Sequence, residues 1–510
     1  MTLRIVATPL DYPLSAPEPR EGGFRSDLLP AFVPAPGYEA LLERLRAPAA
    51  LVVTTGQQPA LFGGPLYTIY KALSAAAFAD ALSRRWGRPV APVFWAAGDD
   101  HDFAEANHAA WLAADGSLAG AALPARTPDA PLTPMYREPL GEPVLGAIDA
   151  LERDLPPSEF RDETIGWIRR HWRPDATVGS AFASAMAELL APHGVLVLDS
   201  THPAVKRAAA PLLVQALAGS RRINQALAAR AEALAREGRD AGVNPGDGAT
   251  LVMIECRMGR DRLVMLPDGG YTTRRGKSTY DLAKLAGLTE RQPERFSPNV
   301  LLRPVVESAL LPTVAYMGGP GELRYLPLTL PVYEALGMPR QQPTPRWSGV
   351  LVEARVDRAL EKFGISLPDL MQPPGALEAR LVRSRLPEGV LAALAELRDG
   401  IVAGYDPVLA AARDIDPTLE KPVTTARNHA VAATQDVEKK LVQHLKKRAE
   451  TELTQIARAR HAVWPDGKPQ ERVLTAAPFL ARHGPTLLED LLADMRQWYA
   501  GGLEGARRGA

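Results

Sequence analysis

The chain has 510 residues, 46% of them hydrophobic and 23% charged, a globular composition long enough for roughly two to four folding units. Its 59 basic and 59 acidic residues balance, so net charge gives no attraction to nucleic acid or to an anionic membrane. The N-terminus lacks a signal-peptide pattern, and no segment has the roughly 20 apolar residues that cross a bilayer. We therefore expect a cytoplasmic protein without nucleic-acid or membrane partners.

Four short apolar runs that end in glycine or acidic residues predict the strands of a buried parallel sheet. These runs span 51–56, 92–100, 195–200 and 313–319, and their continuous apolar character is typical of strands covered on both faces. Between the first two runs, residues 66–86 place apolar side chains at helical spacing. A strand, a Gly-rich turn, a helix and a second strand form a βαβ unit, so residues 1–350 are predicted to form a Rossmann-like α/β core.

Two segments of this core are long for crossovers and are interpreted as connecting insertions, at about 110–185 and 205–298. In the second, residues 262–275 place two β-prone runs around a Pro-Asp-Gly-Gly turn, which predicts a hairpin. The Gly-Lys-Ser sequence at 276–278 resembles the end of a P-loop. However, the required earlier glycine would fall at Tyr271, and the segment follows a hairpin turn, so we reject a P-loop.

Residues 351–475 are predicted to form a helical coiled-coil domain. Apolar positions from Leu394 to Leu409 make one helical stripe, and those from Val437 to Ile456 make another. Prolines at 417 and 422 interrupt the pattern between them. Two long helices that fold back as an antiparallel coiled coil are the simplest interpretation, and the stripes also suit an oligomer interface. The last segment, 476–510, is predicted to be helical and to pack back.

The first candidate binding motif follows the first strand and opens the first helix. It contains Gly56, Gln57 and Gln58, then Tyr67 and Lys71. Glycines let the backbone approach a ligand, and a helix N-terminus favours an anion. The first βα turn is also where open α/β sheets bind ligands. A Gly-rich turn without a ligand is the alternative.

The second motif is an acidic cluster around a histidine, at the end of the second strand. It contains Asp99, Asp100, His101 and Asp102. Carboxylates this close together raise some of their own pKa values, which suits a general base, a bound amine or a divalent metal. A zinc site with His101 and His108 matches no standard spacing, so we assign no metal ligands. An acidic helix N-cap is the structural alternative.

The third motif combines Asn299 and Arg303 with a second Gly-rich turn that includes Gly319 and Glu322. Arg303 suits a carboxylate or phosphate, and Glu322 suits an amine; a tight turn with a structural arginine is the alternative. A fourth motif, 464–472, either caps a helix end or brings Lys468 and Arg472 to a nucleotide phosphate.

The single cysteine, Cys256, excludes an intramolecular disulfide. It lies in an apolar run, so we interpret it as a small core residue rather than as a catalytic thiol.

Taken together, the motifs resemble the bacillithiol biosynthesis cysteine-adding enzyme family. The matching segments span 55–72, 92–108, 195–206, 296–322 and 464–473. The resemblance implies a Rossmann-like core with two insertions, a C-terminal coiled coil that forms a homodimer, and a ligase that adds L-cysteine to glucosaminyl-malate through an amide bond in the last step of bacillithiol synthesis. The sequence departs from the family pattern at Asp99, where Glu is expected, at Arg324, where an apolar residue is expected, and at Thr475, where Asn is usual.

A free carboxylate is a poor acyl donor at neutral pH, so we expect ATP or another nucleotide to activate cysteine; the need for a divalent metal stays open. The core of the family that this chain resembles is similar to nucleotidyltransferases of the class I aminoacyl-tRNA synthetase type, which favours an adenylate by analogy. Neither His-x-Gly-His nor Lys-Met-Ser-Lys-Ser is present here. The alternatives are another amino-acid ligase or nucleotidyltransferase on the same core, and a non-catalytic coiled-coil scaffold.

The expected roles of the site residues are as follows. Catalysis, by positioning the amine and accepting its proton, is assigned to Asp100, His101 and Asp102. Substrate binding is assigned to Gly56, Gln57, Gln58, Tyr67, Lys71, Asn299, Arg303, Gly319 and Glu322. Nucleotide contact is assigned to Lys468 and Arg472.

Overall fold

The computed structural model describes residues 3–9, 12–244, 246, 248–386 and 389–508. Contacts divide the chain into two units. Unit 1 contains Leu3–Leu351 and Gln470–Ala510, and unit 2 contains Val352–Pro469. In the described part of the chain, no helix is both long and apolar enough to span a membrane.

A five-stranded parallel sheet forms the centre of unit 1. Its order is β13 (Gln342–Pro345), β12 (Thr313–Gly318), β2 (Leu51–Gln57), β3 (Val90–Ala96) and β6 (Leu196–Asp199). The four apolar runs of the sequence provide four of these strands, and almost all of their side chains are buried. The predicted Rossmann-like core is therefore confirmed. The second run ends as a strand at Ala96, because residues 97–100 turn back on themselves through a bond from Asp100 N to Ala97 O.

Helix α2 (Tyr67–Trp86) lies between this sheet and the C-terminal helix α20 (Thr486–Arg508), which explains why α2 is buried on nearly every side. Tyr499 of α20 packs against Phe78 of α2 and donates a hydrogen bond to Pro345 O at 2.8 Å. The other helices of the core are α1 (Tyr38–Arg46), α10 (Arg303–Leu310), α11 (Pro320–Tyr325), α12 (Leu330–Leu336) and α19 (Ala477–His483).

After the short helix α3 (Phe103–Ala106), the segment that follows β3 forms a hairpin and three longer helices. They are β4 (His108–Leu112), β5 (Leu118–Ala122), α4 (Pro143–Asp154), α5 (Arg161–His171) and α6 (Val178–Leu190). Thr177 and Ser180 begin α6 with reciprocal side-chain-to-backbone bonds, the capping box that supplies partners to unpaired N–H groups.

The segment after β6 adds three helices and an antiparallel sheet. The helices are α7 (Pro203–Ala218), α8 (Ser220–Arg236) and α9 (Leu282–Arg291). The sheet order is β10 (Thr279–Tyr280), β9 (Tyr271–Thr273), β8 (Gly259–Met265), β7 (Ala249–Cys256) and β11 (Phe296–Pro298). Strands β8 and β9 form the predicted hairpin. In the Gly-Lys-Ser turn, the carboxylate of Asp261 accepts bonds from Arg275 N and Gly276 N, each at 2.8 Å. Two N–H groups of this turn are thus already engaged, which agrees with rejecting a P-loop.

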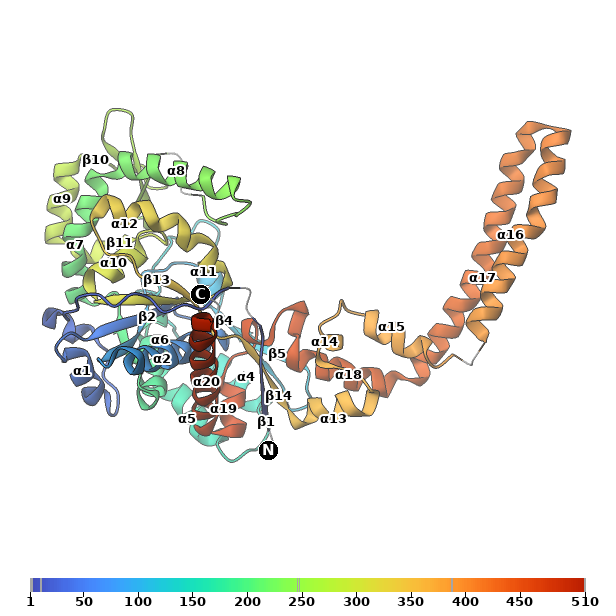
Figure 1. The fold of residues 1–510 in the computed structure, drawn as a ribbon, viewed down its shortest axis with the longest axis horizontal. Coiled ribbons are helices and arrows are strands. Elements are labelled where there is room, and N and C mark those ends of the chain that lie inside the picture. Colours follow the sequence, from blue (N-terminus) through green and yellow to red (C-terminus); the bar gives the residue numbers. More distant parts are fainter. Residues whose placement is uncertain (1–2, 10–11, 245, 247, 387–388, 509–510) are drawn as a thin grey trace. The chain divides into compact units, whose positions relative to one another are not determined.

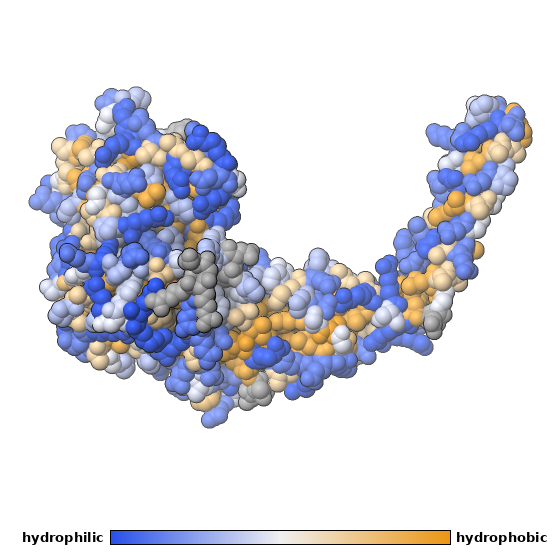
Figure 2. All heavy atoms as spheres, in the orientation of Figure 1, coloured by the Kyte–Doolittle hydropathy of each residue, from blue (hydrophilic) through white to orange (hydrophobic). Residues whose placement is uncertain are grey.

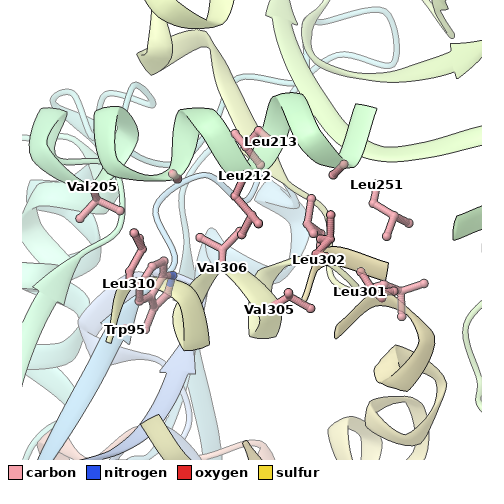
Figure 3. Close-up of a cluster of buried hydrophobic side chains, with 14 of the residues drawn as sticks. Trp95, Val205, Leu212, Leu213, Leu251, Leu301, Leu302, Val305, Val306 and Leu310 are labelled. Carbon is pink, nitrogen blue, oxygen red and sulfur yellow. The ribbon is translucent and has the colours of Figure 1, made fainter. Parts of the chain in front are cut away.

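An apolar core joins the two five-stranded sheets of unit 1. Figure 3 shows side chains of α7 and α10 facing each other, with Trp95 of β3 and Leu251 of β7 at the same cluster. The members labelled there are all buried, among them Leu212, Leu302 and Val306. Helices α7 and α10 therefore fix the antiparallel sheet to the parallel one.

Unit 2 is helical. After β14 (Gly349–Glu353), which pairs with β1 (Leu3–Ala7), its helices are α13 (Ala354–Phe363), α14 (Leu367–Leu370), α15 (Ala376–Arg383), α16 (Val390–Ile415), α17 (Glu420–Arg448) and α18 (Glu450–Val463). Helices α16 and α17 lie side by side as the predicted antiparallel pair (Figure 1), and Arg398 contacts Glu438 across them at 3.2 Å. Asp416 accepts a bond from Thr418 N at 2.8 Å in the turn between the two helices.

A substitution at Gly259 tests the contact between the two insertions, where Gly259 of β8 lies against Leu132. It has φ +78°, and a Cβ atom there would clash with the main chain of Leu132, to which its neighbours are hydrogen-bonded. Gly259→Ala should lower the free energy of unfolding by about 1–2 kcal/mol from the left-handed backbone and by about 1–3 kcal/mol more from the clash. Urea denaturation measures the difference.

Gly269→Ala is the matched control. Its φ is +90°, but its Cβ would meet nothing within 4 Å, so only the backbone cost should remain. Equal losses in the two variants would show that the contact with Leu132 does not matter.

Candidate functional site

A cavity of about 480 Å³ lies between the carboxyl edge of the parallel sheet and the antiparallel sheet. Its walls come from the ends of β2, β3, β6, β12 and β13, and from β7, β8 and β11. Crevices at the carboxyl ends of parallel strands are the usual ligand sites of open α/β folds. Here the segment inserted after β6 supplies the facing wall.

Most of the predicted site residues line this cavity. They are Gly56, Gln57, Gln58, Tyr67, Lys71, Asp100, His101, Asn299, Arg303, Gly319, Glu322 and Arg472. The lining does not include Asp102 or Lys468. Asp102 is the exposed N-cap of α3 (Phe103–Ala106), where its carboxylate accepts a bond from Glu105 N at 3.2 Å. Lys468 belongs to unit 2 and follows the short helix η7 (Pro465–Gly467).

Lys71 and Glu322 form an ion pair in the cavity wall. The Lys71 side chain is only 2% exposed, and its Nζ lies 2.7 Å from Glu322 Oε2 and donates to Gly56 O. The Glu322 carboxylate also accepts bonds from Gly319 N, at 2.9 Å, and from Tyr316 OH. Burial would raise the pKa of Glu322, but Lys71 and then Arg303 outweigh it and hold this pKa below its ordinary value. Two residues predicted to hold opposite substrate charges therefore neutralise each other.

Arg303 is held by partners within the protein. Its guanidinium donates to Tyr316 OH at 3.1 Å and to Tyr325 OH at 3.2 Å, and it pairs with Glu307 one helical turn away. Glu307 is fully buried and also accepts a bond from Thr54 Oγ1 at 3.3 Å. Sequence reasoning missed Glu307, although its i,i+4 spacing from Arg303 was a signal.

The loop after β3 is fixed from several directions. Asp99 pairs with the buried Lys206 of α7, which also donates to Phe296 O at 3.0 Å. The Asp100 carboxylate accepts bonds from His101 N at 2.6 Å and from Asp102 N at 3.1 Å. Asp99, one of the three positions that depart from the family pattern, thus joins the loop to the segment after β6.

His101 contacts an arginine that the sequence did not single out. Arg260 of β8 places one guanidinium nitrogen 3.2 Å from His101 Nδ1, and its other nitrogens donate to Ser297 Oγ at 2.9 Å and to Pro298 O at 2.7 Å. Burial and, next, the charge of Arg260 lower the pKa of His101. Arg262 of β8 also lines the cavity. The hairpin pattern gave no signal of this role, since it identified the strands but not what they face.

Two more ionisable side chains of the lining were not assigned roles from the sequence. Burial, followed by the charges of Asp102 and Asp100, raises the pKa of Glu105. Arg346, which follows β13, is 3% exposed and forms a buried pair with Glu471, with one contact at 3.1 Å. Burial also raises the pKa of Tyr67 to about 12, so this phenol keeps its proton at neutral pH.

Several other positions lie away from the cavity lining. Arg324 is exposed and pairs with Asp240 at 2.6 Å. Thr475 donates to Phe62 O at 3.0 Å, and exposed His108 lies 3.1 Å from Ala104 O. Cys256, expected in the core, is partly exposed at the end of β7. The described residues contain no group of three or more His, Cys, Asp or Glu side chains arranged to hold a metal.

The pairing of Glu307 with Arg303 should contribute strongly to stability. Glu307→Gln removes the nearest anion of a buried guanidinium, which is left with Glu322 at 3.7 Å, and removing one member of a buried pair costs about 3–5 kcal/mol. We expect a loss of about 3 kcal/mol in the free energy of unfolding by chemical denaturation.

Glu43→Gln makes the same chemical change in a pair with Arg46 that is exposed on both sides. Its effect should be below about 0.5 kcal/mol. Similar small effects of both substitutions would refute a stabilising role of the buried pair.

Comparison with known proteins covers both units. Residues 34–346 match the family model for the N-terminal Rossmann-like domain of bacillithiol biosynthesis BshC, and residues 349–498 match the model for its C-terminal coiled-coil domain. A relative named "Putative cysteine ligase BshC" from Heliobacterium modesticaldum is 32% identical over 464 residues, which are 89% of this chain and 83% of the relative. The relative of the same name from Symbiobacterium thermophilum is 33% identical over 478 residues, which are 90% of this chain and 84% of the relative. The chain belongs to the bacillithiol biosynthesis BshC family.

Proposed function

We propose that this protein joins L-cysteine to glucosaminyl-malate through an amide bond, the last step of bacillithiol synthesis. The observation that carries the proposal is the extent of the match: both family domains are present in order, and the relatives named as cysteine ligases align over about nine-tenths of this chain. Fold alone would not support an activity, so the chemistry of the cavity has to suit the substrates as well.

The charges of the lining suit these substrates. Glucosaminyl-malate has two carboxylates and an amine, and cysteine has one of each. Arg262 and Arg472 belong to the lining, and guanidinium groups bind carboxylates through parallel hydrogen bonds. Asp100 and Glu105 place carboxylates there, which suit an ammonium group. The Lys71–Glu322 pair, already neutral, serves as a fixed wall in this proposal.

The chemical step forms a bond between the sugar nitrogen and the activated carbonyl carbon of cysteine, and the leaving group departs with its electron pair. The nitrogen must lose a proton as this happens. Of the carboxylates near the loop after β3, Asp99, Asp100 and Glu105 line the cavity, and Asp99 is already paired with Lys206. Asp100 and Glu105 remain as candidates, and the raised pKa of Glu105 suits a proton acceptor. We assign the proton to this pair, while Asp102 caps α3.

We further propose that ATP or another nucleotide activates the cysteine carboxylate. Arg472 lines the cavity and can pair with a phosphate. The contact of Lys468 with the nucleotide stays a prediction. Release of AMP would indicate an adenylate, and release of ADP would indicate an acyl-phosphate.

A mass-spectrometric assay tests the activity. The purified protein should convert cysteine, glucosaminyl-malate and ATP into bacillithiol, and parallel reactions with and without a divalent metal would show whether the metal is required. The Arg324→Ala variant should retain the wild-type preference for cysteine and glucosaminyl-malate, because Arg324 pairs with an exposed carboxylate and is not part of the lining.

Absence of product from cysteine together with turnover of another amino acid would favour another ligase of this core. Release of pyrophosphate with transfer of AMP to a small molecule would favour a nucleotidyltransferase. If these substrates neither react nor shift the melting temperature of the protein, a coiled-coil scaffold would be favoured.

We also propose that unit 2 forms a homodimer through the α16–α17 pair. Leu394 and Leu409 of the predicted stripes are buried, but Leu397, Val408 and Val437 are about half exposed, at 53%, 50% and 49%. Figure 2 shows apolar residues among hydrophilic ones along this helix pair. Exposed apolar stripes of coiled-coil helices are commonly covered by another chain.

Val437→Glu should therefore shift the protein toward a monomer in sedimentation velocity, because a buried carboxylate would be unpaired in the interface. Gln435→Glu adds the same charge at a neighbouring exposed position and should leave the dimer intact. A monomeric wild-type protein would contradict the proposal.

A further inference from the structure

We propose that His101 acts as a hydrogen-bond donor through Nε2–H, and that Arg260 is the positioning residue that fixes this tautomer. The tautomer of His101 does not depend on the proposed function. Only the use of the donor in amide formation rests on that function. It changes the role expected from the sequence, where His101 was assigned with the aspartates as a proton acceptor.

The first argument is the direction of the contact between the two side chains. The guanidinium nitrogen of Arg260 lies 3.2 Å from His101 Nδ1. A guanidinium has only donors, so Nδ1 has to accept the hydrogen bond. A neutral imidazole carries a single proton, which must then reside on Nε2.

The second argument is that Arg260 has little freedom to move away. It is 8% exposed, and its remaining nitrogens are fixed by Ser297 Oγ and by Pro298 O in the antiparallel sheet. The main chain of His101 is held as well, because Arg126 donates to its carbonyl at 2.9 Å. Arg126 is itself held by the carboxylate of Glu138 at 2.5 Å. Both partners of the contact are thus positioned before a substrate arrives.

The third argument is the protonation state. The strongest charge effects on the imidazole oppose one another: Arg260 and Arg126 disfavour its cation, and Asp100 and Asp102 favour it. Burial is the largest influence, and with the arginines it lowers the pKa of His101. His101 is therefore neutral at physiological pH, and the described residues offer no hydrogen-bond partner to its Nε2.

A neutral Nε2–H at the cavity wall can donate to an oxygen but cannot accept the proton of the attacking amine. The natural target is the carbonyl oxygen of the activated cysteine, on which negative charge develops as the carbon–nitrogen bond forms. His101 keeps its proton throughout, and the proton lost by the nitrogen goes to Asp100 or Glu105. The acid–base work and the oxygen stabilisation are thereby divided between different side chains.

Nitrogen NMR of the full-length protein labelled with ¹⁵N-histidine tests the tautomer without any reaction. The chain has nine histidines, so the His101 signals are identified by their loss in His101→Gln. We expect Nδ1 to be unprotonated and Nε2 protonated at neutral pH. Arg260→Met, which has no donor, should give mixed tautomers, and Arg260→Lys, which keeps a donor, should restore the Nε2–H form. A proton on Nδ1 or a charged imidazole in the wild-type protein would overturn the proposal.

Kinetics test the use of the donor. Losing one such donor lowers kcat by about 100- to 1,000-fold, so His101→Ala should show a loss of that size. His101→Gln retains an N–H donor but no base, and we expect it to lose less than about tenfold. Equal large losses in both variants, with unchanged melting temperatures, would identify His101 as a base. If the wild-type protein forms no bacillithiol, the proposed function fails, while the NMR result still decides the tautomer.

Discussion

Burying ionised groups beside a binding cavity constrains the rest of unit 1. Two cations, Lys71 and Arg303, and two carboxylates, Glu307 and Glu322, meet below the carboxyl edge of the sheet. Removing such charges from water costs several kcal/mol for each ion, and only close pairing with further hydrogen bonds offsets that cost. The groups come from α2, α10 and α11, and Tyr316 of β12 bonds to both Arg303 and Glu322. These elements cannot shift relative to one another without leaving a charge unpaired, so the floor of the cavity is rigid.

The two insertions build the opposite side of the site around the 98–101 loop. Main-chain bonds join the loop to the first insertion, from Tyr136 N to Gly98 O at 3.0 Å and from Met135 N to Asp100 O at 2.7 Å. Tyr136 OH then donates to Glu255 of β7, in the second insertion. Burial, with Glu255 next, raises the pKa of Tyr136, so its phenol remains a donor. An open crevice of a Rossmann-like fold thereby becomes a walled cavity, in which polar contacts are stronger than in water.

The sequence predicted the strands and most of the lining, but it predicted the partners within the site poorly. Buried strands are recognisable because their apolar runs are a local property. The pairing of Lys71 with Glu322 joins residues far apart in the chain, so the sequence suggested two ligand-binding residues where the structure has an ion pair. Asp100 and Asp102 look equivalent in sequence, yet only the backbone turn decides that Asp102 caps α3. Arg260 could not be found from a hairpin pattern, because that pattern does not state which face of the sheet meets the cavity.

The residues around the cavity therefore fall into two groups: those that hold its shape and those that can take part in a reaction. The Gly-rich turns and their charged neighbours are largely occupied by one another: Gly319 N is bonded to Glu322, and Gly56 O to Lys71. These charged groups bind one another and so hold the edge of the sheet in place. Chemistry then depends on groups whose partners leave a functional atom available, such as the second nitrogen of His101. Since Arg260 sets the state of that nitrogen, a residue of the inserted sheet, and not one of the core motifs, determines what His101 can do.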